Sequence, residues 1–298
     1  MDIAATWRSL AVAARPTQWL KNLVVFAALV FAQELDEPTS VLRTLAAFGI
    51  FCLLSSSVYL LNDIVDVNED RLHPWKRERP IASGDLSLHT ASAASALLAV
   101  AGLLLARAVG LQFFYAGAAY VALTICYHFL LKRLVIVDVL AVAVGFVIRA
   151  MAGAYAIDVI ISPWLLVCTT LLALFLGFAK RRQELIDLGV EAADHRSVLV
   201  SYSGQMLDQM IGIVAAATIV GYCLYTMWPE TAAKFGQESA RRLLYTIPFV
   251  AYGVFRYLFL IHKREAGGRP ERVLLSDWPL LLNLLLYLAV VAWAIYQP

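Results

Sequence analysis

The chain has 298 residues, of which 61% are hydrophobic and only 15% charged, and its mean hydropathy is +0.73. Soluble globular domains are rarely more than half apolar, so this composition excludes that class and predicts a chain embedded largely in a membrane. The net charge of +2 says little by itself, and no nucleic-acid partner is expected. The four cysteines lie within apolar blocks and form no CxxC pair, which excludes a disulfide framework and a structural zinc site.

The N-terminal segment shows no cleavable signal peptide, because residues 1–18 contain arginines and lack a sustained apolar core. Residues 2–14 are expected to form an amphipathic helix on the membrane surface. The rest of the chain contains nine apolar blocks of 15–21 residues, close to the length of about 20 residues needed to cross a bilayer. The blocks are residues 19–33, 44–62, 88–106, 111–130, 136–156, 163–179, 208–227, 243–261 and 279–296. The predicted fold is an all-α polytopic membrane protein with one domain, residues 1–298.

Lysine and arginine residues alternate strongly between successive loops. Seventeen lie on one predicted side and five on the other, while Arg149 and Arg256 lie within spans. Because cytoplasmic loops are rich in lysine and arginine, the N-terminus is expected in the cytoplasm and the C-terminus on the outer face. Chemistry is therefore expected on the cytoplasmic side, where the loops are long and polar.

Polar residues cluster where the chain enters the first span. Arg15, Gln18 and Asn22 share one face of an α-helix, and Lys21 lies beside that face. An aromatic–lysine pair at this depth is also ordinary interfacial anchoring. A contact with an anion and simple anchoring are left open here.

The second span ends in an aspartate-rich segment. Asn62 and Asp63 close the span, and Asp63, Asp66 and Asp70 lie at i, i+3 and i+7, on one face of a helix. Converging carboxylates repel one another unless a cation lies among them, and hard oxygen ligands favour Mg²⁺. We expect the three aspartates to bind Mg²⁺ at the start of a cytoplasmic loop, residues 63–87.

A basic stretch follows the aspartates directly. Its side chains include Arg71, His73, Lys76, Arg77 and Arg79, with prolines and a glycine that favour a shaped loop. Such residues bind phosphate groups, although a basic loop near a membrane also binds anionic lipid head groups. Because it adjoins the carboxylates, the stretch is predicted to bind substrate phosphates, and His73 alone indicates nothing specific.

Further polar residues flank the fourth, fifth and sixth spans. Tyr127 and Lys132 precede Asp138, which lies three helical turns before Arg149 within the fifth span. A buried arginine needs an anionic partner or a polar cavity, so either a neighbouring carboxylate or a substrate is expected.

The sixth span ends in a mixed cluster of charges. Lys180, Arg181 and Arg182 are explained by positive-inside flanking alone, whereas Glu184 and Asp187 are not. We expect this cluster to form a second half-site facing Asp63. No nucleotide-binding, zinc-protease or hydrolase motif accompanies it.

The segments NDIVDVNEDRLHPWKRERPIASG, YHFLLKR and VDVLAVAVGFVIRAMAG resemble the UbiA superfamily of intramembrane transferases, and the resemblance runs over essentially the whole chain. It implies nine transmembrane helices around a central cavity open to the cytoplasmic face, with Mg²⁺ as cofactor, in a bacterial plasma membrane. Most members carry a paired-aspartate second motif, but the cluster at 180–184 is basic here. RPTQWLKN and GFAKRRQEL are similar to the decaprenyl-phosphate phosphoribosyltransferase branch.

This branch implies transfer of 5-phosphoribose from 5-phosphoribosyl 1-diphosphate to a polyprenyl phosphate, for cell-wall arabinan precursors. These two substrates together carry three phosphate-bearing regions, and such a pair suits a site with one acidic and one basic motif. The catalytic and metal-binding assignments are Asp63, Asp66 and Asp70, with Glu184 as a further metal ligand. The predicted substrate-binding residues are Arg15, Gln18, Lys21, Asn22, Asn62, Lys76, Arg77, Arg79, Tyr127, Lys132, Asp138, Arg149, Lys180, Arg181, Arg182 and Glu184.

Two other functions remain open at this point. One is an aromatic prenyltransferase with a diverged second motif. The other is a transporter of organic phosphates, which the scarcity of polar clusters in the outer loops disfavours. Prenyl chain length, the downstream polysaccharide and a homo-oligomeric state are left open by the sequence.

Overall fold

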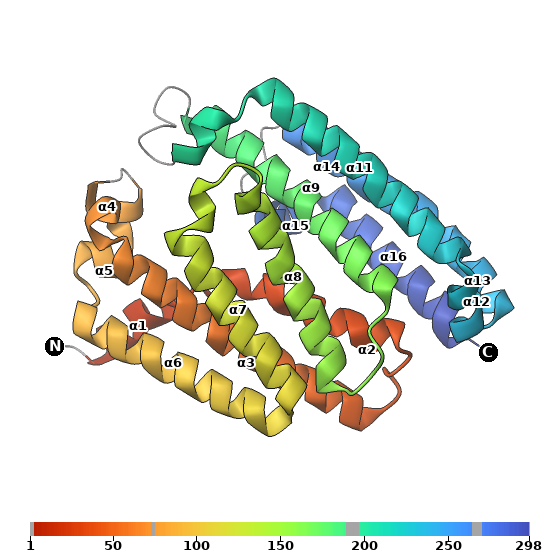
Figure 1. Cartoon of the computed structure of the whole chain (residues 1–298), viewed down its shortest axis with the longest axis horizontal. Helices are drawn as coiled ribbons and strands as arrows, with labels where there is room; N and C mark the ends of the chain where they lie inside the picture. Colours follow the sequence, from red (N-terminus) through yellow and green to blue (C-terminus); the bar gives the residue numbers. More distant parts are fainter. Residues whose placement is uncertain (1–2, 73–74, 189–196, 264–269, 298) are drawn as a thin grey trace. The chain divides into compact units, whose positions relative to one another are not determined.

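The computed structural model describes residues 3–72, 75–188, 197–263 and 270–297, and these are helical or irregular, without a β-strand (Figure 1). The all-α prediction is confirmed. Seven helical stretches of the described residues are long and apolar enough to cross a membrane. They are α3 (Pro38–Val65), α6 (Leu88–Val109), α8 (Val137–Ala156), α9 (Pro163–Leu188), α11 (Gly204–Met227), the stretch Gln237–Lys263 and α16 (Trp278–Tyr296). The chain is an integral membrane protein.

Two of the nine predicted spans have a different character from these seven. The block at 111–130 forms a 19-residue helix, α7 (Leu111–Phe129), whose tyrosines, Gln112 and His128 lower its hydropathy. The block at 19–33 is not one α-helix. It begins as an 11-residue 3₁₀ helix, η1 (Pro16–Phe26), and continues as the short α2 (Ala27–Phe31).

The structure divides into two compact units. The first comprises Met1–Leu29, Glu37–Phe129 and Ile148–Ile160. Its N-terminal segment forms helix α1 (Ile3–Ala13), within the residues 2–14 predicted to be helical, and the location of this helix on the membrane surface stays a prediction. The first unit also contains α4 (Val67–Leu72), the 3₁₀ turn η2 (Lys76–Glu78) and α5 (Pro80–Ser83). These three short elements lie within the segment 63–87, which was predicted as a loop.

The core of the first unit forms where α3 packs against α6 and α7 (Figure 1). Phe51 and Phe113 are fully buried there, with their ring centroids 5.7 Å apart in an edge-on arrangement. Gly153 of α8 lies against the backbone of Val25 in η1, and a Cβ atom there would stand 2.0 Å from the carbonyl oxygen of Val25. Only glycine permits this close approach, which fixes η1 beside the second half of α8.

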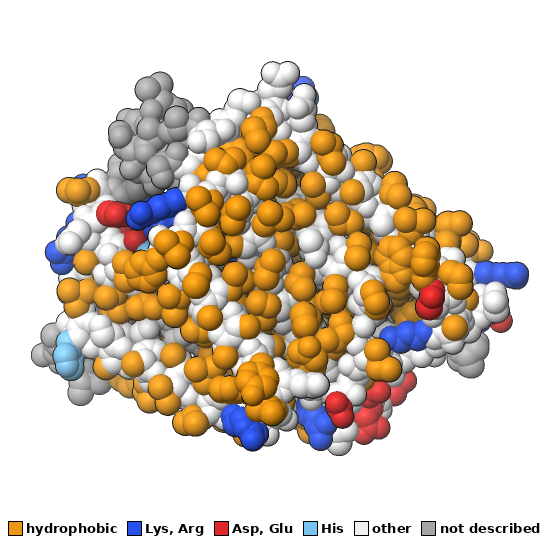
Figure 2. Space-filling model, in the orientation of Figure 1, with side chains coloured by type: hydrophobic (Ala, Val, Ile, Leu, Met, Phe, Trp, Pro, Cys, Tyr) orange, Lys and Arg blue, Asp and Glu red, His pale blue; other side chains and the backbone are white. Residues whose placement is uncertain are grey.

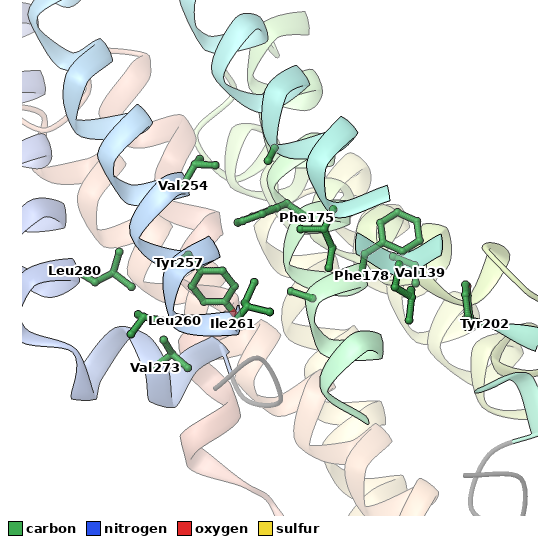
Figure 3. Close-up of a cluster of buried hydrophobic side chains, with 14 of the residues drawn as sticks. Val139, Phe175, Phe178, Tyr202, Val254, Tyr257, Leu260, Ile261, Val273 and Leu280 are labelled. Atoms are coloured by element: carbon green, nitrogen blue, oxygen red, sulfur yellow. The ribbon is translucent and has the colours of Figure 1, made fainter. Parts of the chain in front are cut away.

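The second unit comprises Val30–Asp36, Leu130–Val147 and Ile161–Pro298. In it α9 packs along α11, and α14 (Ile247–Lys263) packs on α16 (Figure 1). Figure 3 shows its core, in which Phe175 of α9 meets Tyr257 of α14 with ring centroids 5.5 Å apart. Val139 reaches the same core from α8, and Tyr202 reaches it from the segment that precedes α11.

The remaining elements of the second unit are short. They are η3 (Leu131–Arg133), η5 (Ser197–Ser201), α12 (Pro229–Phe235), α13 (Gln237–Leu243), η6 (Leu244–Thr246) and α15 (Pro270–Ser276).

Hydrophobic side chains cover most of the face drawn in Figure 2, and the lysine, arginine, aspartate and glutamate side chains visible there lie toward its margins. Large apolar side chains on the helices, such as Leu97 (69% exposed) and Ile213 (69% exposed), face outward. A surface of this kind is stable in hydrocarbon and unfavourable in water, which agrees with the membrane location.

Candidate functional site

The aspartate-rich segment is interrupted at its middle residue. Helix α3 ends at Val65, and Asp66 has φ −85° and ψ 7° before α4 begins at Val67. Asp63 and Asp70, one on each side of this break, are both 2% exposed. The three aspartates therefore do not lie on one uninterrupted helix, although the backbone hydrogen bonds from Asp66 to Asn62 and from Asp70 to Asp66 continue through the break. Among the described residues, no group of three or more carboxylate, histidine or cysteine side chains is gathered as a metal cluster.

Asp63 and Asp70 are joined by one arginine. The Nη1 atom of Arg79 donates to Asp63 Oδ1 at 3.1 Å and to Asp70 Oδ2 at 2.6 Å. Arg15 donates to the same oxygen of Asp63, and Lys76 Nζ lies 4.0 Å from Asp70 Oδ1. The structure thus gathers five residues predicted for the site, with three partly exposed cations around two buried carboxylates.

Asp66 has a partner that the sequence did not reveal. His128, at the end of α7, lies with Nε2 3.1 Å from Asp66 Oδ1 and is 7% exposed. The available signal was a histidine at the end of an apolar block, beside Tyr127. Without the tertiary structure, nothing in that local pattern connected it with an aspartate 62 positions earlier.

The polar residues at the start of the first predicted span lie on the 3₁₀ helix η1 or directly before it. In a 3₁₀ helix, residues three apart are aligned, so the predicted i, i+3, i+7 face of Arg15, Gln18 and Asn22 is wrong. Lys21 Nζ donates to Gln18 Oε1 at 2.5 Å along one row. A second row contains Trp19, which donates to Ser56, followed by Asn22. Arg15 precedes the helix in a left-handed conformation, with φ 54°.

Arg149 is buried in a polar network of the first unit. Its Nε atom donates to Asn22 Oδ1 at 2.8 Å, and its Nη2 atom donates to the Tyr120 hydroxyl at 2.9 Å. The guanidinium also lies over the Tyr120 ring, 4.4 Å from its centroid. Asn22 in turn donates to Ser55 Oγ at 3.2 Å. Both Arg149 and Asn22 come from the predicted set, whereas Tyr120 was not predicted.

In the second unit, Asp138 is fully buried and bound by two side chains. Arg181 Nε donates to it at 2.6 Å, and the Tyr202 hydroxyl donates to it at 2.8 Å. The Tyr202 oxygen also accepts the backbone N–H of Ile136 at 2.6 Å. Burial, together with the neighbouring Asp138 carboxylate, raises the pKa of Tyr202 to about 12, so the phenol remains a donor.

The basic cluster at the end of α9 is divided among acidic partners. Arg181 Nη1 donates to Glu184 Oε2 at 2.5 Å, and Lys180 Nζ lies 3.7 Å from Glu184 Oε1. Arg182 turns instead to α11, where its Nε atom donates to Asp208 Oδ1 at 2.5 Å. Asp187 accepts from the amide of Gln183 at 2.7 Å. Glu184 therefore neutralises cations in this structure.

The remaining predicted residues lie near these clusters in the sequence. Asn62 is half-buried in the last turn of α3, and its carbonyl oxygen accepts the N–H of Asp66. Arg77 is exposed in η2, while Tyr127 and Lys132 are half-buried in α7 and η3. The residues 73–74, which include the predicted His73, lie outside the described part of the chain.

Comparison with known proteins gives a consistent result. Residues 22–273 match the model of the UbiA prenyltransferase family. The decaprenyl-phosphate phosphoribosyltransferase of Mycolicibacterium smegmatis is 35% identical over 292 residues, which cover 95% of this chain and 91% of that protein. The enzyme of the same name from Corynebacterium glutamicum is 32% identical over 290 residues, covering 95% of this chain and 86% of that protein.

A solved structure has a similar fold. It is a UbiA homolog from Archaeoglobus fulgidus bound to DMAPP and Mg²⁺, with a TM-score of 0.73, 17% sequence identity and coverage of 97% of this chain and 100% of that one. The family match spans most of the sequence, and the relatives match along nearly their whole length. This chain belongs to the UbiA prenyltransferase family.

Proposed function

We propose that this protein transfers 5-phosphoribose from 5-phosphoribosyl 1-diphosphate to a polyprenyl phosphate and releases diphosphate. The relatives at 32–35% identity carry the name of this activity, and they match nearly the full chain. The basic cluster Lys180–Arg182, in place of the paired aspartates usual in the family, supports a donor that carries an additional phosphate.

The observation that carries the proposal is the cluster of Asp63, Asp70, Arg15 and Arg79. Two buried carboxylates lie close enough for one nitrogen of Arg79 to reach both. Buried charges are retained at a membrane boundary when they are paired or functional. A cluster with both signs provides oxygen ligands for a cation and guanidinium donors for the phosphates that the cation accompanies.

These residues fit a magnesium ion. Asp63 and Asp70 provide hard oxygen ligands, and Asp66 follows one turn after Asp63. When bound, Mg²⁺ supplies positive charge that stabilises the diphosphate leaving group. Magnesium is present in the structure of the Archaeoglobus fulgidus homolog, which supports the same cofactor here.

The arginines change partners in the proposed cycle. In the structure Arg15 and Arg79 neutralise Asp63 and Asp70. When the diphosphate enters, the two guanidinium groups move to phosphate oxygens, which match their planar donor geometry. The carboxylates would then be neutralised by the bound Mg²⁺ in place of the arginines. Lys76, 4.0 Å from Asp70, and the exposed Arg77 provide further donors for the same group.

Other residues bind the remaining phosphates in this proposal. Lys180 and Arg182 bind the 5-phosphate of the donor, and Glu184 accepts from a ribose hydroxyl or contributes to the metal site. Arg149 and Asn22 bind the acceptor phosphate, whose tail extends into the bilayer between apolar helices. The acceptor phosphate is already ionised, so its attack on the ribose carbon requires no strong general base.

The proposed topology has nine membrane crossings around a cavity open to the cytoplasm, with the N-terminus and the aspartate-rich segment on that side. The 17-to-5 distribution of basic residues supports this orientation. A tag accessibility assay on both termini tests it, because the two ends should lie on opposite faces.

The decisive experiment incubates the purified protein with Mg²⁺, radiolabelled phosphoribosyl diphosphate and polyprenyl phosphate. Label should move into an organic-soluble, acid-labile lipid, and chelation of the metal should stop the transfer. The Asp63→Asn variant should lose at least about a hundredfold in turnover, the scale of a lost electrostatic contact with the leaving group. Its matched control is Asp85→Asn, an exposed aspartate of the same region.

Two results would contradict the proposal. Near-normal turnover by the Asp63→Asn variant would contradict the assignment of Asp63 as a ligand of the metal ion. Transfer observed only with a prenyl diphosphate and a phenol would instead identify an aromatic prenyltransferase.

A further inference from the structure

Arg182 is held by a residue of another helix. Its Nε atom donates to Asp208 Oδ1 at 2.5 Å, joining α9 to α11, which pack side by side (Figure 1). The Arg182 side chain is 15% exposed, and that of Asp208 is 41% exposed. The arginine is therefore partly enclosed, while its partner lies near the surface at the end of the bundle.

The contact with Asp208 uses only the Nε atom of the Arg182 guanidinium. Within the described residues, the hydrogen bond of the Arg182 side chain is the one from Nε, so both terminal nitrogens keep their donors for another group. Arg181 differs, because its Nε atom binds Asp138 and its Nη1 atom binds Glu184. Of the two arginines, Arg182 is the one arranged to present a two-pronged donor to a phosphate.

A histidine of a third helix lies against the same carboxylate oxygen of Asp208 that accepts from Arg182. His262 Nε2 in α14 lies 3.3 Å from Asp208 Oδ1, and His262 Nδ1 lies 2.9 Å from the carbonyl oxygen of Leu258. A carbonyl oxygen and a carboxylate both only accept hydrogen bonds. The two ring nitrogens of His262 therefore face two acceptors, one on its own helix and one on α11, so that the imidazole lies between α14 and the Asp208 carboxylate.

We infer that Asp208, supported by His262, is a positioning residue that aims the terminal nitrogens of Arg182 at the 5-phosphate of the ribosyl donor. This inference rests on the proposed function. It adds two residues, one on α11 and one on α14, that belong to neither the aspartate-rich segment nor the basic cluster. Their task is to fix the direction of the arginine, because a long side chain loses considerable rotamer entropy when a ligand alone must order it.

The test measures initial rates of the full-length protein in detergent, with phosphoribosyl diphosphate varied and polyprenyl phosphate fixed. Asp208→Asn should raise the KM for phosphoribosyl diphosphate about tenfold, the equivalent of one charge-assisted hydrogen bond. The kcat and the KM for the lipid should stay within about twofold of wild type, since those steps use other residues. Asp208→Glu keeps the carboxylate and should recover part of the loss.

A double-mutant cycle separates positioning from a general loss of structure. In the background of Arg182→Ala, the change Asp208→Ala should raise the donor KM no further, because the residue through which it acts is gone. Asp277→Asn is the matched control, since Asp277 makes an ion pair with Arg256 between α14 and the start of α16. It should lower the melting temperature without a selective change in donor KM.

Distinct outcomes separate this inference from the proposed function. If wild type transfers phosphoribose but Asp208→Asn leaves the donor KM unchanged, the positioning role is wrong and the function stands. Additive effects of Arg182→Ala and Asp208→Ala would also overturn it. If wild type transfers no phosphoribose under any condition, both the function and the inference fall.

Discussion

His128 Nε2 lies 3.1 Å from Oδ1 of Asp66, so an aspartate assigned to metal binding already has a histidine partner on another helix. Asp63 and Asp70 are paired with arginines instead. The three aspartates therefore occupy two electrostatic environments. This separation leads to different expectations for the residues around each carboxylate.

Replacement of His128 should weaken the response to magnesium. Residues that orient a metal ligand typically contribute 10- to 100-fold to metal affinity, so His128→Gln should raise the Mg²⁺ concentration for half-maximal transfer about tenfold. The measurement is a magnesium titration of the transfer rate. His89→Gln, at an exposed position in α6, is the control. An unchanged magnesium requirement in His128→Gln would separate this histidine from the metal site.

Removal of Arg79 should have opposite effects on metal and donor. Arg79 occupies the carboxylates that the cation needs, so Arg79→Ala should bind Mn²⁺ several-fold more tightly than wild type when no diphosphate is present. The same variant should bind phosphoribosyl diphosphate more weakly, because a phosphate donor is lost. Electron paramagnetic resonance of free Mn²⁺ measures the first effect without turnover. Arg107→Ala, an exposed arginine in the last turn of α6, is the control, and weaker Mn²⁺ binding by Arg79→Ala would contradict the exchange of partners.

A methyl group added at Gly153 should destabilise the protein, because it would collide with the backbone of Val25. Gly153→Ala places a carbon 2.0 Å from a backbone oxygen, so η1 must move away from α8 and the hydrogen bond between Asn22 and Arg149 is disturbed. The expected loss of stability is about 1–3 kcal/mol. Thermal unfolding in detergent measures it. Gly49→Ala, with no atom within 4 Å of the added carbon, should be neutral or stabilising, and equal melting temperatures for the two variants would refute the packing argument.

Tyr202 should make stability sensitive to high pH. Its pKa is raised from 10.0 to about 12 in the folded protein, so its contribution is complete below pH 10 and is lost as the pH rises toward 12. Tyr202→Phe should cost about 1–3 kcal/mol at neutral pH, because Asp138 loses a donor. Its melting temperature should then fall less than that of wild type between pH 10 and pH 12. Tyr245→Phe, an exposed tyrosine, should retain the full alkaline decline, and parallel curves for wild type and Tyr202→Phe would contradict the assignment.

The sequence was most informative where local pattern alone determines the outcome. Apolar blocks of about 20 residues predicted α3, α6, α8, α9, α11 and α16, because burial in hydrocarbon depends on composition more than on neighbours. The acidic segment followed by basic residues also predicted a shared site, and Asp63, Asp70 and Arg79 do meet, since only 16 residues separate the most distant pair.

Local sequence patterns did not predict which side chains of distant segments pair with one another. Asp138 and Arg181 are separated by 43 positions, and each was placed in the site for a different reason, yet they bind one another. The register of η1 and the break at Asp66 were also missed, because a periodicity of 3.6 was assumed where backbone geometry departs from it. Partners such as Tyr120, Tyr202 and Asp208 are defined by tertiary packing, which a single sequence does not encode locally.

The 3₁₀ conformation of η1 increases the length that this segment covers along its helix axis. A 3₁₀ helix rises about 2.0 Å per residue, against 1.5 Å for an α-helix. The 11 residues of η1 followed by the five of α2 therefore extend about 30 Å, close to the full thickness of the hydrocarbon core. A regular α-helix would need about 20 residues for the same distance. The 16 residues thus match the length of an α-helix of about 20 residues, while Trp19 and Asn22 keep their hydrogen-bond partners on α3.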